Sequence, residues 1–354
     1  MFFAQFGVMA LSAMMAFGSP QPEAEPYAEE TYPAIVTEAY EYPVTPNDPE
    51  WAELGSTQAR IKACRIPQEV LESMTEEQLV QAVLDFPFRV ELFVYSYIET
   101  GIESMEKNCD AYAELLRRGT AKEALMGRIA CQPAQSTATM EERQDNDVLA
   151  TLILYQKQIE ESLSDEEIDY VKPFLGMFDM FSYEAYKARN AAASEPKTPD
   201  GTAVDYATPS CEWTHSESDH TQWDKDMEET YHVMLVSSGT CRYNCHSYAW
   251  HDQSPSNIYW IDNPGPYMSD GSYTKILSGL SASSLTAASG DIIFYGELSD
   301  LFHAHSAIMD SEPSGAPLAA RTVVSKWGRA GVFQHTQANV PGEYDKMNIS
   351  VWHR

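Results

Sequence analysis

The chain is poor in basic residues. Its 354 residues include 23 Lys and Arg against 53 Asp and Glu, and the formal net charge is -30 at pH 7. A surface this acidic repels the phosphates of nucleic acids and the headgroups of anionic lipids. We therefore expect no nucleic-acid partner and no basic membrane-binding patch. Because the acidic residues are spread along the chain, we interpret the charge as keeping an exported protein soluble.

Cysteine is also scarce and widely spaced. This pattern is not that of a small scaffold held together by dense disulfides. A hydrophobic content of 44% is ample for packed cores, and the length suggests about two domains. If Cys245 is a free nucleophile, five cysteines remain, and we predict that Cys211 pairs with Cys241. The six cysteines are Cys64, Cys109, Cys131, Cys211, Cys241 and Cys245.

The first basic residue is Arg60, so the N-terminus lacks the usual basic start of a secretory signal. Residues 2–18 are nevertheless uncharged and mostly apolar, and Ala16 and Gly18 supply the small side chains that a signal peptidase reads before Ser19. We predict that residues 1–18 are a signal peptide or an N-terminal anchor, rather than a buried core helix. Beyond this segment we expect no membrane insertion, and we expect a secreted or cell-surface protein.

Composition divides the rest of the chain into three parts. Residues 19–55 form an acidic, proline-rich linker, expected to be a solvated tether. Residues 56–192 have apolar side chains at helical spacing and capping-box pairs at Thr75/Gln78 and Ser164/Glu167, which predicts an all-helical domain. The segment "NAAASEPKTPDGTA" at 190–203 marks the boundary of a second domain, residues 200–354.

The second domain begins with a helical pattern and continues with short strand-like runs. Trp223, Met227, Tyr231 and then Met234 or Leu235 recur at helical spacing. The later runs "DIIFYG", "HSAIMD" and "RTVVSKWG" are short and rich in β-branched or aromatic residues, which is typical of strands. The predicted fold class is therefore α+β, with an all-helical domain followed by a helix and an antiparallel sheet.

The run "CRYNCHSYAWH", residues 241–251, is the densest group of reactive side chains. Cys245 follows the helix-capping residue Asn244 and precedes His246, so we predict a nucleophile at the start of a helix. In such a position the pKa of a thiol falls from about 8.5 to roughly 3.5–7.5. His305 opens the predicted strand "HSAIMD", which could bring an imidazole base beside the sulfur.

Two metal sites are alternatives to a nucleophile. Cys211, His215, Cys241 and Cys245 could form a tetrahedral zinc site, although their spacing fits helical pairs better than a zinc knuckle. His303 and His305 could act as a metal pair on one strand face, but no carboxylate cluster is obvious nearby. We assign His246, His251 and His303 to ordinary hydrogen-bonding roles, and we expect no metal and no cofactor.

Taken in order, "YNCHSYAW", "GDIIFYG" and "HSAIM" resemble the motifs of NlpC-like and CHAP-like papain-fold cysteine peptidases. With "SKWG", they are similar to a bacterial secreted subgroup, and the resemblance covers roughly residues 65–350. It implies a papain-like domain with Cys245 as nucleophile and His305 as base. The implied activity is hydrolysis of amide bonds, with peptidoglycan peptides as substrate.

The resemblance places the third catalytic residue on the strand after the base. That position is Ser325 in "VVSKWG", expected to orient His305, and His335 in "GVFQH" is the rival. The segment "ANVPGEYD" departs from the Cys-Pro-Tyr associated with this subgroup. The backbone N–H of Cys245 is the expected oxyanion donor, with Tyr243 as a second. The alternative function is a catalytically silent papain-like domain that serves as a surface binding or adhesion protein.

Overall fold

The computed structural model describes residues 39–175, 196–208, 217–279, 287–310, 321–342, 344 and 347–354, with the side chains of 217–220 and 277–279 excepted. Residues Ile35–Arg354 form one compact unit. Both predicted domains, 56–192 and 200–354, lie within this unit. The predicted signal or anchor, residues 1–18, lies outside the described residues.

The N-terminal part of this unit is helical, as predicted. Both predicted capping boxes form, because the side chains of Thr75 and Ser164 accept from the backbone N–H groups of Gln78 and Glu167. The helices are α1 (Pro49–Glu53), α2 (Thr57–Ala63), α3 (Gln68–Ser73), α4 (Glu76–Leu84), the 3-10 helix η1 (Arg89–Phe93), α5 (Ile98–Asn108), α6 (Asp110–Arg118), α7 (Ala121–Ala130), α8 (Met140–Tyr155), α9 (Lys157–Glu160), α10 (Asp165–Val171) and the 3-10 helix η2 (Lys172–Phe174).

The end of the predicted linker is packed, which corrects the expectation of a tether up to residue 55. Trp51 in α1 is only 2% exposed, and its indole N–H donates to the carbonyls of Glu229 and Thr230 at 3.2 and 2.9 Å. The hydroxyl of Tyr42 donates to the carbonyl of Ala82 at 2.8 Å. These two aromatic rings offer enough apolar surface to hold the segment, whereas proline and acid content suggested a tether.

The helix α12 (Glu217–Tyr231) follows the predicted apolar stripe only in part. Trp223, Met227 and Tyr231 are buried, as their spacing predicts. The helix ends at Tyr231, and His232 has a left-handed φ of 54°. Met234 is therefore not in the helix but opens strand β1, where its side chain is 52% exposed.

The strands form an antiparallel sheet in the order β1-β6-β5-β4-β3-β7-β2. The predicted strands around Ile293, Ala307 and Val324 are present, so a mixed α+β fold with an antiparallel sheet is confirmed. The remaining elements are β1 (Met234–Ser237), α13 (Cys245–Trp250), α14 (Gly265–Ser269), β2 (Thr274–Gly279), β3 (Ile292–Tyr295), β4 (His305–Met309), β5 (Thr322–Lys326), β6 (Val332–Thr336), the 3-10 helix η4 (Gln337–Asn339) and β7 (Ile349–His353).

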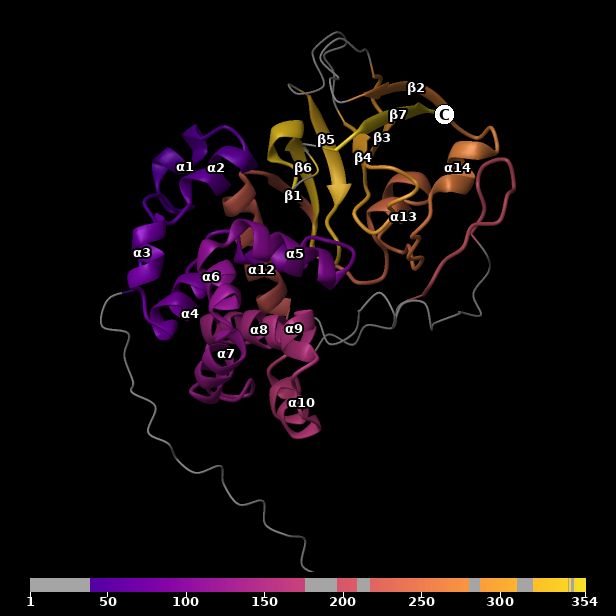
Figure 1. Cartoon of the computed structure of the whole chain (residues 1–354). Helices are drawn as coiled ribbons and strands as arrows, with labels where there is room; N and C mark the ends of the chain where they lie inside the picture. The colour runs from indigo at the N-terminus through magenta and orange to yellow at the C-terminus, as the bar shows by residue number, and fades with distance from the viewer. Residues whose placement is uncertain are drawn as a thin grey trace, which may run out of the picture. The chain divides into compact units, whose positions relative to one another are not determined.

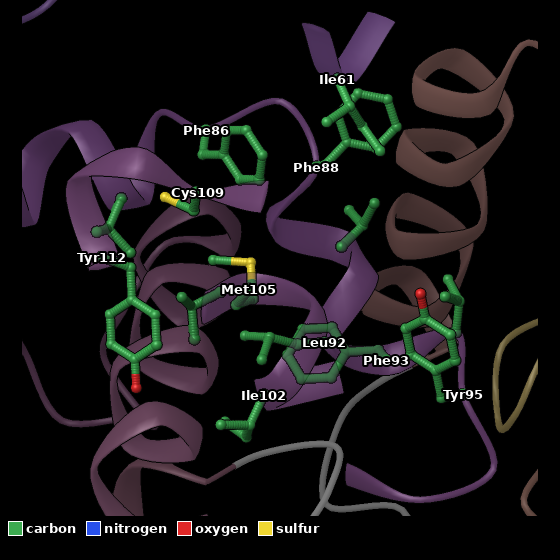
Figure 2. Packing of buried hydrophobic residues seen from close by; sticks show 14 of the residues in the cluster. Ile61, Phe86, Phe88, Leu92, Phe93, Tyr95, Ile102, Met105, Cys109 and Tyr112 are labelled. Atoms are coloured by element: carbon green, nitrogen blue, oxygen red, sulfur yellow. The ribbon is translucent and has the colours of Figure 1, made fainter. Parts of the chain in front are cut away.

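One hydrophobic core joins the helices to the sheet. Figure 2 shows its helical side, where Phe86, Phe88, Leu92 and Phe93 gather around Met105. The same cluster of buried side chains continues to the sheet residues Ile293, Ala307, Met309, Val323 and Phe333. Buried side chains of the two predicted domains therefore belong to one core.

Strand β4 separates this core from the helix α13. Side chains alternate along a strand, and Ala307 and Met309 belong to the core shared with the helices. Ser306 and Ile308 point to the other face, where Ser306 contacts α13 and Ile308 packs near Tyr243 and Tyr248. Figure 1 shows α13 beside the sheet.

Candidate functional site

The predicted helix start at Cys245 is confirmed. Cys245 is the first residue of α13, and Asn244 is its N-cap. The Asn244 side chain accepts from the backbone N–H of Ser247 at 3.0 Å and donates to the carbonyl of Ile261 at 2.8 Å. Because these bonds are buried, they fix the start of the helix to the neighbouring loop.

Ser306 of β4 anchors α13 to the sheet. Its hydroxyl lies 2.8 Å from Nδ1 of His246 and accepts from the indole N–H of Trp250 at 2.9 Å. The backbone of Ser306 also lies close enough to the sulfur of Cys245 to lower the pKa of the thiol. The sulfur therefore sits at the beginning of β4, next to the backbone of His305.

The sulfur of Cys245 is covered by the helical part of the chain. Cys245 is only 1% exposed, and the hydroxyl of Ser96 lies 3.9 Å from its sulfur. Ser96 belongs to the connection between η1 and α5. The nucleophile predicted from sequence is thus a buried thiol, although an enzyme's nucleophile must reach its substrate.

Burial raises the pKa of Cys245 to about 11, which corrects the expected fall. The N–H groups of Ser306 and His246, the hydroxyl of Ser96 and the charge of Lys326 all oppose this rise in pKa. They do not outweigh the cost of a thiolate in a site closed to water. The sequence showed the hydrogen-bond donors at the helix start, but it did not show that Ser96 lies against the sulfur.

His305 opens β4, as predicted, and is 1% exposed. Its ring stacks on that of Tyr344, with 4.5 Å between centroids and 10° between planes. Its Nε2 atom is buried without a hydrogen-bond partner. Burial, followed by the nearby His335 and His246, lowers its pKa well below the ordinary value, so the imidazole is neutral. Among the described contacts, no hydrogen bond joins this ring to the Cys245 sulfur.

The predicted hydrogen bond from Ser325 to His305 is wrong. The Ser325 hydroxyl lies 2.8 Å from Nε2 of His335 and accepts from the indole N–H of Trp327 at 2.8 Å. The Nδ1 of His335 lies 3.0 Å from the carbonyl of Thr336, which can only accept. Nδ1 therefore carries the proton, and the Ser325 hydroxyl donates to Nε2. The two rivals for the third position bond to each other.

Strand register explains this outcome. Ile308 pairs with Val324 and Met309 with Val323, so continuing the β4–β5 ladder places Ser325 opposite Ala307 and not opposite His305. On the other side of β5, Val323 pairs with His335, which puts the His335 ring diagonally beside Ser325 on one face. Sequence alternation identified the face correctly, but the partner depended on the register.

Lys326 is a buried amine on the same side of the sheet as α13. Its Nζ donates to the carbonyls of Gly328 and Ala330 at 2.7 and 2.6 Å and lies 5.6 Å from the centroid of the Tyr243 ring. Burial lowers the pKa of Lys326 to about 7, while its interactions with Asp224 and Cys245 raise it. Lys326 is therefore a basic neighbour of the Cys245 sulfur that the sequence analysis did not single out.

Tyr344 is a second residue that the sequence analysis missed. It lies in "GEYD", where the resemblance led us to expect Cys-Pro-Tyr, so the tyrosine of that pattern was the available signal. Its ring lies in the core and stacks on His305. Ser96, in contrast, carries no sequence signal, because nothing along the chain relates it to Cys245.

His303 lies between two carboxylates at the edge of this region. Its Nε2 is 2.8 Å from Glu103 of α5, and its Nδ1 is 3.0 and 2.9 Å from the oxygens of Asp300. Burial acts to lower the pKa of His303, but these carboxylates raise it above the ordinary value. A cavity of about 210 Å³ adjoins the pair, and its walls include Tyr95, Lys107 and Tyr344.

The zinc alternative does not fit the cysteine chemistry. Cys241 is disulfide-bonded, so it is not a thiolate ligand, whereas Cys245 is a free cysteine. Cys211, the predicted disulfide partner, and His215 lie outside the described residues. Within the described part of the chain, no three His, Cys, Asp or Glu side chains are grouped so as to hold a metal ion. In the same residues, no helix combines the length and apolar character needed to cross a membrane.

Comparisons with protein-family models, with curated proteins and with solved structures find no match to this chain.

Proposed function

We propose that the chain is a cysteine hydrolase that cleaves amide bonds, with Cys245 as nucleophile and His305 as base in a papain-like domain. The observation that carries this proposal is the 2.8 Å hydrogen bond between His246 and Ser306, the residues that directly follow Cys245 and His305. It joins the start of α13 to the start of β4, which are the two elements that papain-like sites combine. The antiparallel sheet that follows α13 supports the same assignment.

In this mechanism His305 takes the thiol proton on the nitrogen nearest the sulfur. The thiolate attacks the carbonyl carbon, and the backbone N–H of Cys245 stabilises the oxyanion. The protonated His305 then gives its proton to the leaving amine as the C–N bond breaks, which leaves a thioester. Water attacks the thioester, His305 accepts its proton, and the acid and the free thiol are released.

In this proposal, the neighbours of His305 set the orientation of its ring and keep the imidazole neutral. Tyr344 restricts the ring by stacking at 4.5 Å. His335, held by Ser325, lies close enough to lower the pKa of His305, which favours the neutral base. We propose that Ser325 is a positioning residue that acts through His335.

We propose peptidoglycan peptides as the substrate class and a secreted or cell-surface location on a bacterium. Both proposals come from the motif resemblance, and the acidic surface agrees with an exported protein. The cavity beside Tyr344 is the proposed substrate recess, because one of its walls is the ring that stacks on His305.

The second candidate is a catalytically silent papain-like domain used for surface binding or adhesion. It is favoured by the buried thiol with a pKa of about 11 and by the missing hydrogen bond between Cys245 and His305 among the described contacts. Both candidates share one fold, so only chemistry separates them.

Hydrolysis of purified peptidoglycan by the full chain tests the proposal. New amino groups should appear with the wild type and be lost with Cys245→Ala and with His305→Ala, while Cys131→Ala, a change at an exposed free cysteine, should keep the activity. A stoichiometric thiol-directed probe should label Cys245 in the active preparation. Release of amines by the Cys245→Ala variant at the wild-type rate would exclude Cys245 as the nucleophile.

A further inference from the structure

We propose that residues 95–97, between η1 and α5, are an autoinhibitory cover that holds the Cys245 thiol unreactive until the cover moves. We call this segment the cover. The inference rests on the proposed function only in taking Cys245 as the nucleophile, and it concerns regulation of that site. Contacts at each of the three cover residues carry it.

The middle residue of the cover lies on the sulfur. Ser96 Oγ is 3.9 Å from Cys245 Sγ, and Cys245 is only 1% exposed. A carbonyl carbon must come within about 3–3.5 Å of the sulfur to react. A substrate cannot take that position while Ser96 occupies it, so attack requires the cover to leave.

The last residue of the cover is bound to loops of the sheet-containing part. The ring of Tyr97 stacks on that of Phe302, with 5.1 Å between centroids and 4° between planes. The Tyr97 hydroxyl also donates to the carboxylate of Asp262. Phe302 lies just before β4, so this contact fastens the cover beside His305.

Tyr95, the first residue of the cover, packs so closely against Gly328 and Gly342 that neither position has room for a side chain. Gly328 and Gly342 have left-handed φ values of 45° and 51°, and a Cβ built on either would overlap Tyr95. Gly328 is the glycine of "SKWG". Its missing side chain therefore has a structural reason beyond the turn itself, namely the backbone of Tyr95 passing against it.

Helix α5, which follows the cover, makes two further contacts with the loop before β4. The Thr100 hydroxyl donates to the carbonyl of Phe302 at 3.4 Å, and Glu103 lies 2.8 Å from His303. Both contacts are partly exposed, and Ser96 itself is half-buried, whereas Tyr95 is part of the shared core. Local opening of Ser96 and Tyr97 next to an anchored Tyr95 costs less than global unfolding, so the thiol can be uncovered while the fold persists.

The test measures how fast iodoacetamide alkylates Cys245 in the full chain. Site-resolved mass spectrometry of non-reduced samples follows Cys245 and the exposed free Cys131 in the same tube. Cys131 serves as the internal reference, and Cys64 and Cys109 are buried. In the wild type, Cys245 should react at least about a hundredfold more slowly than Cys131, as expected for a site that reacts only on opening.

A variant that loosens the cover should expose the thiol. Tyr97→Ala with Glu103→Gln removes the stacking partner of Phe302 and the carboxylate at His303. We expect Cys245 alkylation to accelerate by about tenfold, which corresponds to about 1.4 kcal/mol. The matched control, Tyr170→Ala with Glu166→Gln, makes the same changes at exposed positions of α10 and should leave the rate unchanged.

A cross-link reports the position of the cover independently. Ser96→Cys should form a disulfide with Cys245 on mild oxidation, because the two side chains are neighbours. Ser73→Cys, at an exposed position of α3, should form none. The Ser96→Cys cross-link should form more slowly when Tyr97→Ala and Glu103→Gln are added.

Two results would overturn the cover. One is wild-type Cys245 reacting as fast as Cys131. The other is loss of the Ser96→Cys cross-link in the loosened variant with no change in Cys245 alkylation. Failure of the hydrolase proposal looks different: Cys245 alkylation would follow these expectations, but neither the wild type nor Tyr97→Ala alone, which leaves Glu103 in the proposed recess, would release amines from peptidoglycan. In that case the cover stands and the enzyme assignment does not.

Discussion

Ser325 Oγ and His335 Nε2 lie 2.8 Å apart, and Trp327 donates its indole N–H to the same hydroxyl at 2.8 Å. Ser325 is fully buried, and two hydrogen bonds join the three residues into a chain with Ser325 at its centre. Ser325 was predicted to hydrogen-bond to His305, but its hydroxyl binds His335 and Trp327 instead.

The variant Ser325→Ala should therefore lower stability. It leaves the Trp327 N–H and the His335 Nε2 buried without partners, and each such group costs about 1–3 kcal/mol. Urea unfolding at pH 7 should show a loss of about 2 kcal/mol or more. Ser73→Ala, at an exposed position, should change stability by less than about 0.5 kcal/mol. Reduced hydrolysis with unchanged stability would instead indicate a direct contact with His305.

The alkylation rate of Cys245 should keep rising at alkaline pH. Its pKa is raised to about 11 by burial, and the reactive thiolate is a minor species below that value. Between pH 7 and 10 the rate should rise about tenfold per pH unit, whereas a free thiol such as glutathione levels off above its ordinary pKa of about 8.5. A plateau near pH 7 would indicate an activated thiolate, as the sequence alone suggested.

The ion pair between His303 and Glu103 should stabilise the protein at acidic and neutral pH. Hydrogen bonds to Glu103 and Asp300 raise the pKa of His303 despite the opposing effect of burial. A raised pKa in the folded state means that the stabilisation is complete below the ordinary value of about 6.5 and is lost as the pH rises through the raised one.

Glu103→Gln should therefore lower stability by less than about 1 kcal/mol near pH 6, since the pair is partly exposed, and by less still near pH 9. Urea unfolding at the two pH values measures this difference. Glu106→Gln serves as the control, because Glu106 is on the same helix but accepts from Gln156. A deficit for Glu103→Gln that grows with pH would contradict the pairing. Lys107 and Tyr344 are the titratable residues that border the same cavity as the pair, and neither variant changes them.

Lys326 should affect stability with the opposite pH trend. Burial lowers its pKa to about 7, so between about pH 7 and 10.4 the unfolded chain binds a proton that the folded chain does not. Stability contributed by this group must rise with pH across that window. The increase should be present in the wild type and absent in Lys326→Met.

The two variants for this comparison are Lys326→Met and Lys275→Met. Lys275 is also a lysine near an aromatic ring, 5.8 Å from the centroid of Trp352, but its side chain is exposed. Lys275→Met should follow the wild-type pH dependence of unfolding by urea. Parallel curves for the wild type and Lys326→Met would show that Lys326 stays charged in the fold.

The sequence by itself determined the elements and their faces. The capping boxes at Thr75 and Ser164, the helix start at Cys245 and the strand start at His305 all depend on residues within a few positions of one another. Helix caps and strand alternation are local, so periodicity and side-chain type were enough to predict them.

Only the tertiary structure decided which side chains meet. Ser325 faces His335 because of a register set over whole strands, and Trp51 packs on α12 across 179 residues of chain. Ser96 covers Cys245 because the helices and the sheet share one core. The pKa of Cys245 follows from that cover: burial removes water from the thiolate, and no residue near Cys245 in the sequence reveals it.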